Sequence, residues 1–447
     1  MTRWENTSVY RALGTLSALP ARALSRLPLR EGKTRRGLSF SQWFLLLGTE
    51  AMLCVPHGAW NNLCAVLFAL AALLVYWFDC AARKKTPWNA GNLGAAVLGF
   101  LLMTVLCTLW AKDKAGNLRV ALFFWTGFLL AYLAAAQFRR RDERRTAAAV
   151  LYVTLLAVSV YGLWNYLTGA EASDVPIDGE MYRRLGATLE HGINCGEFLA
   201  MALPIALVWA LTARTGARRL GLAVPLLLPC AAILLTYART GWIMLALALF
   251  LLLWYKKKIL LLPAAALGIG ALFLLPESVQ ARFLSMLDFS NASASGRFVL
   301  WGECLALWKE KWLSGIGLGP ENFYAAYAPY ATGLLDFQPP HSNMLYLEMF
   351  LSTGILGGVL FCGFFFGIFV RLRRAVRAIP EKRDRWEVQA LTASLAGAAL
   401  GGIPEYIWFY PRILFFWCAL FGMAIAASGD NRTGQPADPA REPLDKP

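Results

Sequence analysis

The chain of 447 residues is 58% apolar and only 16% charged, yet it has a formal net charge of +15. Soluble proteins are about one quarter charged, so this composition excludes an ordinary soluble protein and, despite the basic balance, a soluble nucleic-acid binder. The 17 Trp and 27 Phe residues are typical of an integral membrane protein, whereas near-ordinary Gly and Pro contents exclude a collagen-like or disordered chain.

A membrane-spanning helix needs about 20 mostly apolar residues. Twelve segments come close to this criterion, at residues 39–56, 58–80, 91–111, 119–138, 146–167, 193–213, 220–237, 241–255, 259–275, 344–370, 386–405 and 407–427. We therefore expect an all-α polytopic membrane protein with about 12 transmembrane helices. Because the first 38 residues contain eight Lys/Arg and no apolar core of signal-peptide length, the first span should be an uncleaved signal-anchor.

The loops between these segments alternate between basic and non-basic. If the N-terminus is cytoplasmic, 32 of the 43 Lys/Arg fall in the inner segments. Such a bias sets membrane orientation, and it predicts that both termini lie on the cytoplasmic side. The expected organisation is a basic segment (1–38), a transmembrane domain (39–427) and a cytoplasmic tail (428–447).

Two predicted outer segments, 168–192 and 276–343, are too long for plain connections. The second contains a helical pattern at 297–313, with an aromatic face. The residues on this face are Trp301, Leu305, Trp308 and Trp312. Such a face either lies along the outer membrane surface or packs on its own bundle, and both alternatives imply an ordered outer loop.

Several arginines lie outside the cytoplasmic segments that the charge bias favours, so their positions require a local structural or functional explanation. They are Arg183, Arg184, Arg239 and Arg297 on the outer side, with Arg412 just inside the last span. A guanidinium binds phosphate oxygens in pairs and stabilises charge on a leaving pyrophosphate, while a histidine can take a proton from an attacking hydroxyl. Structural ion pairs with Glu190, Glu197 or Glu405 are the alternative. Glu50, within the first span, has no assigned role, and the three histidines lack metal-site spacing.

Four motifs in order resemble the O-antigen ligase and polymerase superfamily. They are RRLGATLEHGIN (183–194), ARTGW (238–242), GRFVLWGECLALWKEKWLSGIGLGPENF (296–323) and PPHSNMLYLEMFLSTGILGG (339–358). The third is similar to the family's Arg-x-x-x-Trp helix followed by a glycine-rich turn, and the fourth to its histidine signature leading to G-x-x-G. This sequence departs from the family pattern at Ile243, at Ser342, and at Glu190–His191, which replaces the usual Asp-Pro.

The resemblance implies a glycosyltransferase of the bacterial inner (cytoplasmic) membrane. It would use an undecaprenyl-pyrophosphate-linked glycan at the outer face of that membrane, without nucleotide sugar, metal or other cofactor. The acceptor hydroxyl would belong to a lipid A core or another terminal acceptor in a ligase, to a second lipid-linked repeat in a polymerase, or to a wall polymer. Carried over by position, Arg184 and Arg239 hold the pyrophosphate and His341 acts as the base. The remaining candidate binding residues are Arg183, Glu190, His191, Asn194, Arg297 and Ser342. With no carboxylate clearly placed as a nucleophile, inversion is expected.

A different class of protein shares this layout. Twelve spans with both ends inside are also typical of secondary transporters, including a flippase for lipid-linked oligosaccharides. A transporter should place polar residues near the membrane midplane on broken, symmetry-related helices. The concentration of candidate residues in the outer loops favours the enzyme.

Overall fold

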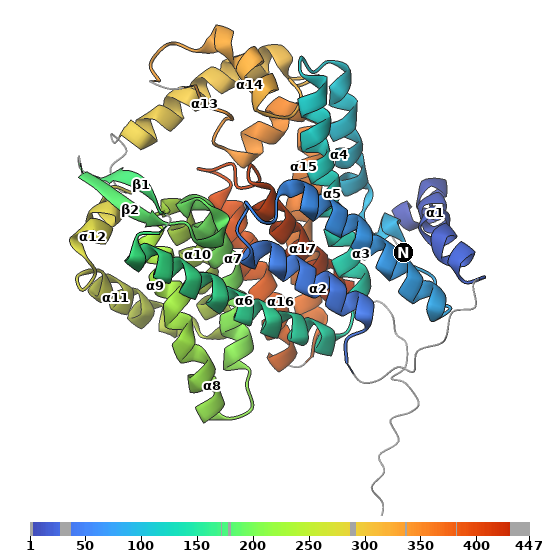
Figure 1. Ribbon diagram of the computed structural model, residues 1–447, viewed down its shortest axis with the longest axis horizontal. Helices are drawn as coiled ribbons and strands as arrows, with labels where there is room; N and C mark the ends of the chain where they lie inside the picture. The colour runs from blue at the N-terminus through green and yellow to red at the C-terminus, as the bar shows by residue number, and fades with distance from the viewer. Residues whose placement is uncertain are drawn as a thin grey trace, which may run out of the picture.

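The computed structural model describes residues 3–26, 37–170, 172–177, 180–286, 292–335, 338–380 and 382–429 (Figure 1). Two strands, β1 (Ala172–Ile177) and β2 (Glu180–Leu185), form an antiparallel hairpin. The α-helices are α1 (Ser8–Leu24), α2 (Phe40–Cys54), α3 (Asn62–Ala82), α4 (Ala95–Leu106), α5 (Lys114–Gln137), α6 (Arg141–Thr168), α7 (Gly192–Leu211), α8 (Gly216–Ala223), α9 (Leu227–Leu235), α10 (Arg239–Lys256), α11 (Leu261–Leu272), α12 (Glu277–Leu284), α13 (Ala292–Lys311), α14 (Pro320–Tyr327), α15 (Leu345–Ala378), α16 (Lys382–Gly401) and α17 (Pro411–Gly429).

Every predicted span corresponds to a helix, with α8 and α9 together forming the seventh. Within the described residues, eight helices are long and apolar enough to cross a membrane, and the prediction of an all-α polytopic membrane protein is confirmed. The other four segments fall short of that criterion. Helices α2, α4 and α11 are short, whereas α16 begins with the charged run KRDRWE.

The core of the bundle is built around α7 and α17, which lie at its centre in Figure 1 and are the most deeply buried of the eight long spans. Helix α5 packs along α17, and α10 and α16 pack against each other and against α7. Aromatic rings fill much of the interior. The rings of Phe128 and Phe364 meet edge to face at 5.3 Å, and Phe365 stacks on Trp417 at 5.2 Å. Such pairs stabilise the fold beyond simple burial, because their quadrupoles are complementary.

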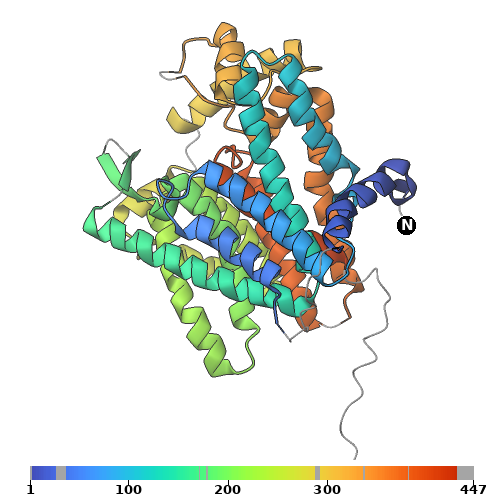
Figure 2. The ribbon, with the colours of Figure 1, turned by 45° about the vertical axis from the view of Figure 1, so that its right-hand side comes forward.

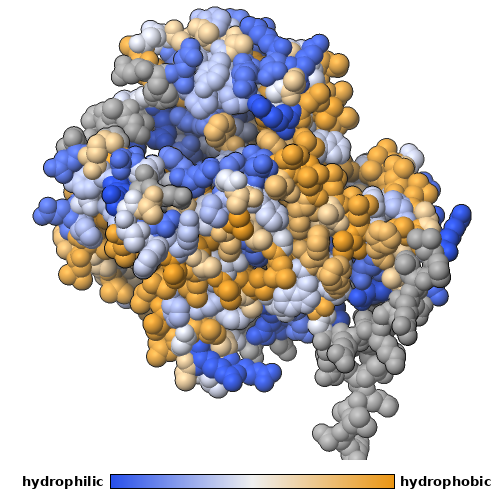
Figure 3. Space-filling view, viewed as in Figure 1, coloured by the Kyte–Doolittle hydropathy of each residue, from blue (hydrophilic) through white to orange (hydrophobic). Residues whose placement is uncertain are grey.

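The outside of the bundle is apolar around its middle. Figure 3 shows an apolar surface across the central helices, with hydrophilic residues gathered above and below it. Helix α11 has no buried residue, and its Leu262 and Leu267 are 80% and 75% exposed. Exposed side chains of this kind suit a lipid environment, where no hydrophobic penalty applies.

Helices α12, α13 and α14 come from the long segment predicted at 276–343, and Figure 2 shows α13 and α14 above one end of the bundle. The buried face of α13 is Leu300, Cys304 and Leu307, which pack with α14 and the start of α15. This face lies one residue before the predicted aromatic face. Trp301 and Trp308 therefore pack at the edge of the cluster, while Leu305 and Trp312 are exposed.

The two glycine-rich motifs meet where α15 is broken. Gly354, with φ 69° and ψ −175°, interrupts the helix, and the backbone N–H of Ile355 donates to the carbonyl of Trp312 at 2.7 Å. A Cβ on Gly354 would come 2.2 Å from the carbonyl oxygen of Leu313, and one on Gly315 would come 2.5 Å from the nitrogen of Gly354. Both motifs need glycine because two backbones are in contact here. This contact fixes the long outer segment to the membrane domain.

Two elements were not predicted. The hairpin β1–β2 lies in the segment 168–192, where a single short pair of strands leaves little periodic signal. The segment 1–38 contains α1, which packs on α3; near it, Trp4 Nε1 donates to the carbonyl of Gly91 at 2.9 Å.

Candidate active site

A cavity of about 290 Å³ lies where the hairpin, the α9–α10 turn, α12, α13 and the α16–α17 loop meet. Its charged lining consists of Arg184, Arg239, Arg282, Arg297 and Glu405. These residues come from five separate parts of the chain. With Glu405 ionised, the lining has a net charge of +3, which suits an anion with more than one negative charge.

The tight turn between α9 and α10 positions two of the arginines through its backbone carbonyls. Arg184 Nε donates to the carbonyl of Thr236 at 2.8 Å, and Arg282 Nε donates to that of Tyr237 at 3.3 Å. Tyr237 has a φ of 50°, which is unusual for a bulky residue. The strained turn therefore presents successive carbonyls to two guanidinium groups.

Arg239 is the first residue of α10. Its Nη1 donates to the carbonyl of Ser285 at 3.2 Å, which links α10 to the end of α12. The N-terminus of a helix carries a partial positive charge and unpaired N–H groups. The positive charge of Arg239 and the partial positive charge at the N-terminus of its own helix thus both favour an anion in the cavity.

Arg297, on α13, forms an ion pair with Glu405, with 3.2 Å between Nη2 and Oε2. The pKa of Arg282 is lowered to about 10, first by burial and then by the positive charges of Arg239, Arg184 and Arg297. Burial also lowers the pKa of Arg184 to about 10, and Glu405 partly opposes this shift. With pKa values of about 10, Arg184 and Arg282 stay charged at neutral pH, so the positive charges in this cavity repel one another and favour a bound anion.

His341 lines a second cavity of about 360 Å³, together with Glu348 and a wall of aromatic residues. The imidazole is 7% exposed, and its ring centroid lies 5.3 Å from that of Tyr406 and 4.4 Å from that of Phe409. Burial, followed by the nearby charge of Arg297, lowers the pKa of His341 to about 4. The ring is therefore neutral at physiological pH.

Hydrogen bonds around residues 341–343 hold this imidazole in place. His341 Nδ1 accepts the N–H of Asn343 at 3.1 Å, so the proton of the neutral ring belongs on Nε2. The N–H of Ser342 donates to Glu348 Oε2 at 2.8 Å, and the Ser342 carbonyl accepts from Trp301 Nε1 at 3.0 Å. Trp301 also lines the arginine cavity, so its indole connects the two cavities.

The loop between α16 and α17 forms a second connection between the cavities. Pro404 and Glu405 line the arginine cavity, and the next residue, Tyr406, lines the histidine cavity. Figure 3 shows a hydrophilic hollow below α13 and α14, at this end of the molecule. The predicted residues Arg184, Arg239, Arg297 and His341 are thus brought into two adjoining cavities.

Strained backbone is concentrated around these residues. Five non-glycine residues of the described chain have positive φ, and four of them are predicted site residues or lie within three residues of one. These four are Ala187, Glu190, Tyr237 and Asn343. Such conformations cost about 1–3 kcal/mol each and cluster at functional sites.

Arg183 lies outside both cavities although it is adjacent to Arg184. Successive residues of a strand point to opposite faces, so Arg184 is buried while Arg183 is exposed and donates from Nη1 to the carbonyl of Tyr166 at 3.3 Å. The sequence could not distinguish the two arginines, because the hairpin itself was not predicted.

Glu190, His191 and Asn194 belong to the turn that starts α7, and they also lie outside the two cavities. His191 caps the helix by accepting the N–H of Ile193 on Nδ1 at 3.3 Å, and Asn194 Nδ2 donates to the carbonyl of Leu189 at 3.3 Å. These contacts give the two residues a role in shaping the turn that follows Arg184.

Arg412 has a structural role that the sequence left open. It is 1% exposed, and its Nη1 donates to the carbonyls of Val55 at 2.6 Å and Thr188 at 3.3 Å, while Nη2 donates to that of Trp60. The side chain thus ties the start of α17 to the α2–α3 loop. Glu405, considered above as an ion-pair partner for Arg412, pairs instead with Arg297.

Arg282 and Glu348 are cavity residues that the sequence interpretation missed. Arg282 lies in ESVQARFL on the predicted outer side, so the topological criterion that selected Arg239 applied to it equally. Glu348 is a buried acid at the start of an apolar helix, a position where charge is costly and usually functional.

The fold and the site define a polytopic membrane protein in which buried arginines lie beside a buried histidine. Residues 224–362 match the family model described as O-antigen ligase. These residues, less than half of the chain, are therefore similar to an O-antigen ligase domain, and they include three of the four motifs noted in the sequence. Arg239, Arg282, Arg297 and His341 lie within the match, whereas Arg184 precedes it.

Other comparisons add little. No curated protein shows significant sequence similarity to the chain. One similar chain comes from a solved structure described as "Structural coordination of polymerization and crosslinking by a peptidoglycan synthase complex". The two share 19% identity over 77% of this chain and 98% of the other, with a TM-score of 0.43.

Proposed function

We propose that the protein transfers a glycan from an undecaprenyl-pyrophosphate-linked donor to a hydroxyl acceptor at the outer face of the cytoplasmic membrane. The observation that carries this proposal is the convergence of four arginines on one cavity beside the cavity of His341. The match of residues 224–362 to the O-antigen ligase family model supports the same class of reaction.

The arginine cavity is the proposed donor site. A lipid-linked pyrophosphate is a diester with two ionised phosphates, and it gains negative charge as the bond to the sugar breaks. Guanidinium groups and a helix N-terminus bind this charge more tightly in the transition state than in the ground state. Arg184, Arg239 and Arg282 would hold the leaving group, while Arg297, paired with Glu405, closes one wall.

The histidine cavity is the proposed acceptor site, and its aromatic walls suit the apolar faces of sugars. The hydrogen bond from the N–H of Asn343 keeps the proton of His341 on Nε2. The imidazole would therefore first donate a hydrogen bond to the hydroxyl of the acceptor substrate. As the base, His341 must take the hydroxyl proton on Nε2, which requires the other tautomer and breaks the Asn343 contact. Glu348, in the same cavity, is a second candidate for proton acceptance.

In the proposed step the acceptor oxygen attacks the anomeric carbon from the face opposite the pyrophosphate. The new C–O bond forms as the bond to phosphate breaks, the electron pair leaves with the pyrophosphate, and the hydroxyl proton passes to the base. Such a single displacement inverts the anomeric configuration. The carboxylate in the donor cavity, Glu405, is held by Arg297 and is not free to act as a nucleophile.

The experiment is transfer by purified protein in nanodiscs with a lipid-linked glycan donor. We expect a new glycosidic bond of inverted configuration by NMR, a loss with Arg184→Gln and little change with the matched control Arg183→Gln. Retention of configuration would instead point to a covalent intermediate on Glu405. Movement of the donor across the bilayer without bond formation would refute the proposal and favour the flippase.

Two variants of the histidine separate its roles. His341→Gln keeps an N–H donor near the position of Nε2, whereas His341→Ala does not. Partial activity in the Gln variant alone would assign His341 a hydrogen-bonding role and leave proton acceptance to Glu348. Equal inactivity of both variants, with normal protein levels, would assign the base to His341. Supplying either a lipid A core or a second lipid-linked repeat as acceptor separates a ligase from a polymerase.

A further inference from the structure

Helix α1 has an apolar stripe that is exposed along almost its whole length. The stripe consists of residues at i, i+3, i+7, i+10 and i+14, a spacing that places them on one side of a helix. They are Val9, Ala12, Leu16, Leu19 and Ala23, and the three large ones are 55%, 62% and 49% exposed. We call these five residues the α1 stripe, which is about 21 Å long. Figure 1 shows α1 at the edge of the bundle.

The opposite side of α1 docks on the bundle. Ala18 and Ala21 are buried, and the helix packs on α3 and on the short turn before α4. Tyr10 Oη donates to Asn92 Oδ1, and Asn89 Nδ2 donates to the carbonyl of Tyr10 at 3.3 Å. These contacts fix the rotation of α1, so the α1 stripe points away from the protein.

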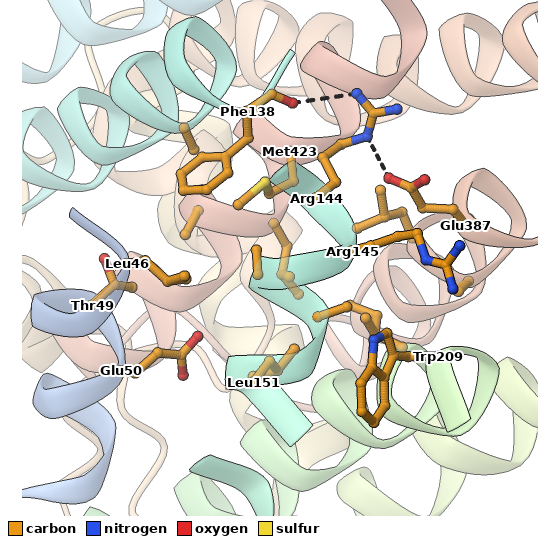
Figure 4. A pocket seen from close by; sticks show the side chains of 18 of the residues that line it. Leu46, Thr49, Glu50, Phe138, Arg144, Arg145, Leu151, Trp209, Glu387 and Met423 are labelled. Carbon is orange, nitrogen blue, oxygen red and sulfur yellow. Dashed lines mark hydrogen bonds and ion pairs between the residues drawn. The ribbon is translucent and has the colours of Figure 1, made fainter. Parts of the chain in front are cut away.

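The docking site of α1 lies at the membrane face that the charge bias predicts to be cytoplasmic. Beside it, the carbonyl of Trp88 accepts from Tyr132 Oη at 2.7 Å. Tyr132 lies less than two turns before the end of α5, which leads into the RRRDERR segment. Figure 4 shows this connection, where Arg144 donates to the carbonyl of Phe138 and pairs with Glu387. Helix α1 is therefore at the same level as the arginine-rich connection between α5 and α6.

Basic and aromatic residues border the α1 stripe. With 3.6 residues per turn, Arg11 and Arg22 lie between the docked side of the helix and the stripe, and both are exposed. Arg26 follows the helix, and residues 6–26 contain no acidic side chain. At the start of this segment, the rings of Trp4 and Tyr10 lie 6.1 Å apart, and both residue types are enriched at membrane interfaces. This pattern is typical of a helix that lies in the plane of the interface.

The neighbouring helix α3 already presents an apolar surface. Its Leu67, Leu70 and Leu74 are 57%, 50% and 52% exposed, which suits contact with lipid. Figure 3 shows apolar surface on α3 and on the adjacent α1. The α1 stripe thus extends the lipid-facing surface of the bundle to the predicted cytoplasmic interface.

We propose that α1 lies in the cytoplasmic surface of the bilayer, with the α1 stripe among the acyl chains and Arg11 and Arg22 at the headgroups of anionic phospholipids. The negative potential of the cytoplasmic leaflet attracts these arginines. A second copy of the chain fits less well, because two α1 helices would bring like charges together. The inference does not depend on the proposed transfer reaction, since α1 contributes to neither of the two candidate cavities.

The test is photo-labelling of the full chain in nanodiscs by a phospholipid that carries a diazirine near the headgroup end of one acyl chain. Mass spectrometry locates the adducts, and those on Leu67, Leu70 and Leu74 of α3 serve as the internal standard. We expect adducts on the α1 stripe, with more from phosphatidylglycerol than from phosphatidylcholine. The double substitution Arg11→Gln and Arg22→Gln should abolish that preference, because it removes the attraction to the anionic headgroup.

Two further variants separate the apolar contact from the charge. In phosphatidylcholine, Leu16→Glu should lower the labelling of α1 relative to α3 about tenfold, because it places a carboxylate among the acyl chains. Thr15→Glu is the matched control, since it adds the same charge at an exposed neighbouring position outside the stripe. We expect its labelling to stay within about twofold of wild type.

Four results would overturn the proposal. These are labelling of α3 without labelling of the α1 stripe, an equal loss with Leu16→Glu and Thr15→Glu, a preference for phosphatidylglycerol that survives the double substitution, or cross-links between α1 helices of two copies in place of lipid adducts. The last result would mean that a second copy covers the stripe. Because Leu16, Arg11 and Arg22 are exposed, these substitutions leave the packing of α1 on the bundle intact.

Discussion

Substituting Arg282 by Gln tests the proposed donor site most directly. Arg282 makes one long hydrogen bond, 3.3 Å, to the Tyr237 carbonyl, and its pKa is lowered by three neighbouring arginines. Removing its charge therefore relieves repulsion in the free protein and costs little folding stability. The same change removes a cation from the bound pyrophosphate. Stability and activity should thus move independently.

The size of the effect follows from the contact that is lost. A hydrogen bond to a charged partner contributes about 1.5–3 kcal/mol. If Arg282 contacts the leaving pyrophosphate in the transition state, its replacement should lower kcat/KM by about 10- to 150-fold. The kcat/KM of Arg282→Lys should fall between those of the wild type and Arg282→Gln, because lysine keeps the charge but lacks the planar guanidinium.

The assay is kcat/KM for transfer from a lipid-linked donor by purified protein, with the melting temperature measured on the same samples. Arg183→Gln serves as the charge-matched control on the exposed face of the hairpin, and we expect it to stay within about twofold of wild type. A kcat/KM for Arg282→Gln within twofold of wild type would refute the assignment of the arginine cavity to the donor. A loss that merely parallels a fall in melting temperature would show that Arg282 is structural.

Two further predictions concern the histidine and the glycine contact. Because burial and the charge of Arg297 depress the pKa of His341 to about 4, NMR titration should find it well below the ordinary 6.5. Arg297→Gln should raise that pKa, since a positive neighbour disfavours the protonated ring, and an unchanged pKa would contradict the assigned cause. Gly354→Ala should destabilise the protein by about 3 kcal/mol or more, because it forces a side chain into a glycine-only conformation against the Leu313 carbonyl. Gly367→Ala, at a helical position of α15 with open space, should leave the melting temperature unchanged or raise it, and equal effects of the two would refute the explanation.

The broken helix α15 bears on the transporter alternative. Broken helices in transporters place polar backbone in a binding site near the midplane. At Gly354 the backbone instead pairs with the loop that contains Leu313 and Gly315, so it is satisfied by protein. The break therefore serves to attach the outer helices and gives no support to a transport site.

The amino-acid pattern was enough to predict the membrane class and to place helical structure in each of the twelve apolar segments, because burial in lipid requires long apolar segments whatever the packing. It also singled out Arg239 and Arg297 as candidate residues, since charges that oppose the topological bias are unusual, and it singled out His341 through the resemblance of its motif to the family's histidine signature. The length of an apolar segment did not show whether its helix is long enough to cross the membrane, because α2, α4 and α11 are shorter than the apolar segments that contain them.

Only the tertiary structure decided which of these residues meet. Arg183 and Arg184 are equivalent in sequence, but the alternation of the hairpin buries one and exposes the other. The carbonyls of the α9–α10 turn bring Arg184 and Arg282 together from positions almost 100 residues apart, and no local pattern encodes such a contact. Hydrophobicity thus defined the apolar segments, whereas the candidate active site depends on long-range hydrogen bonds between loops.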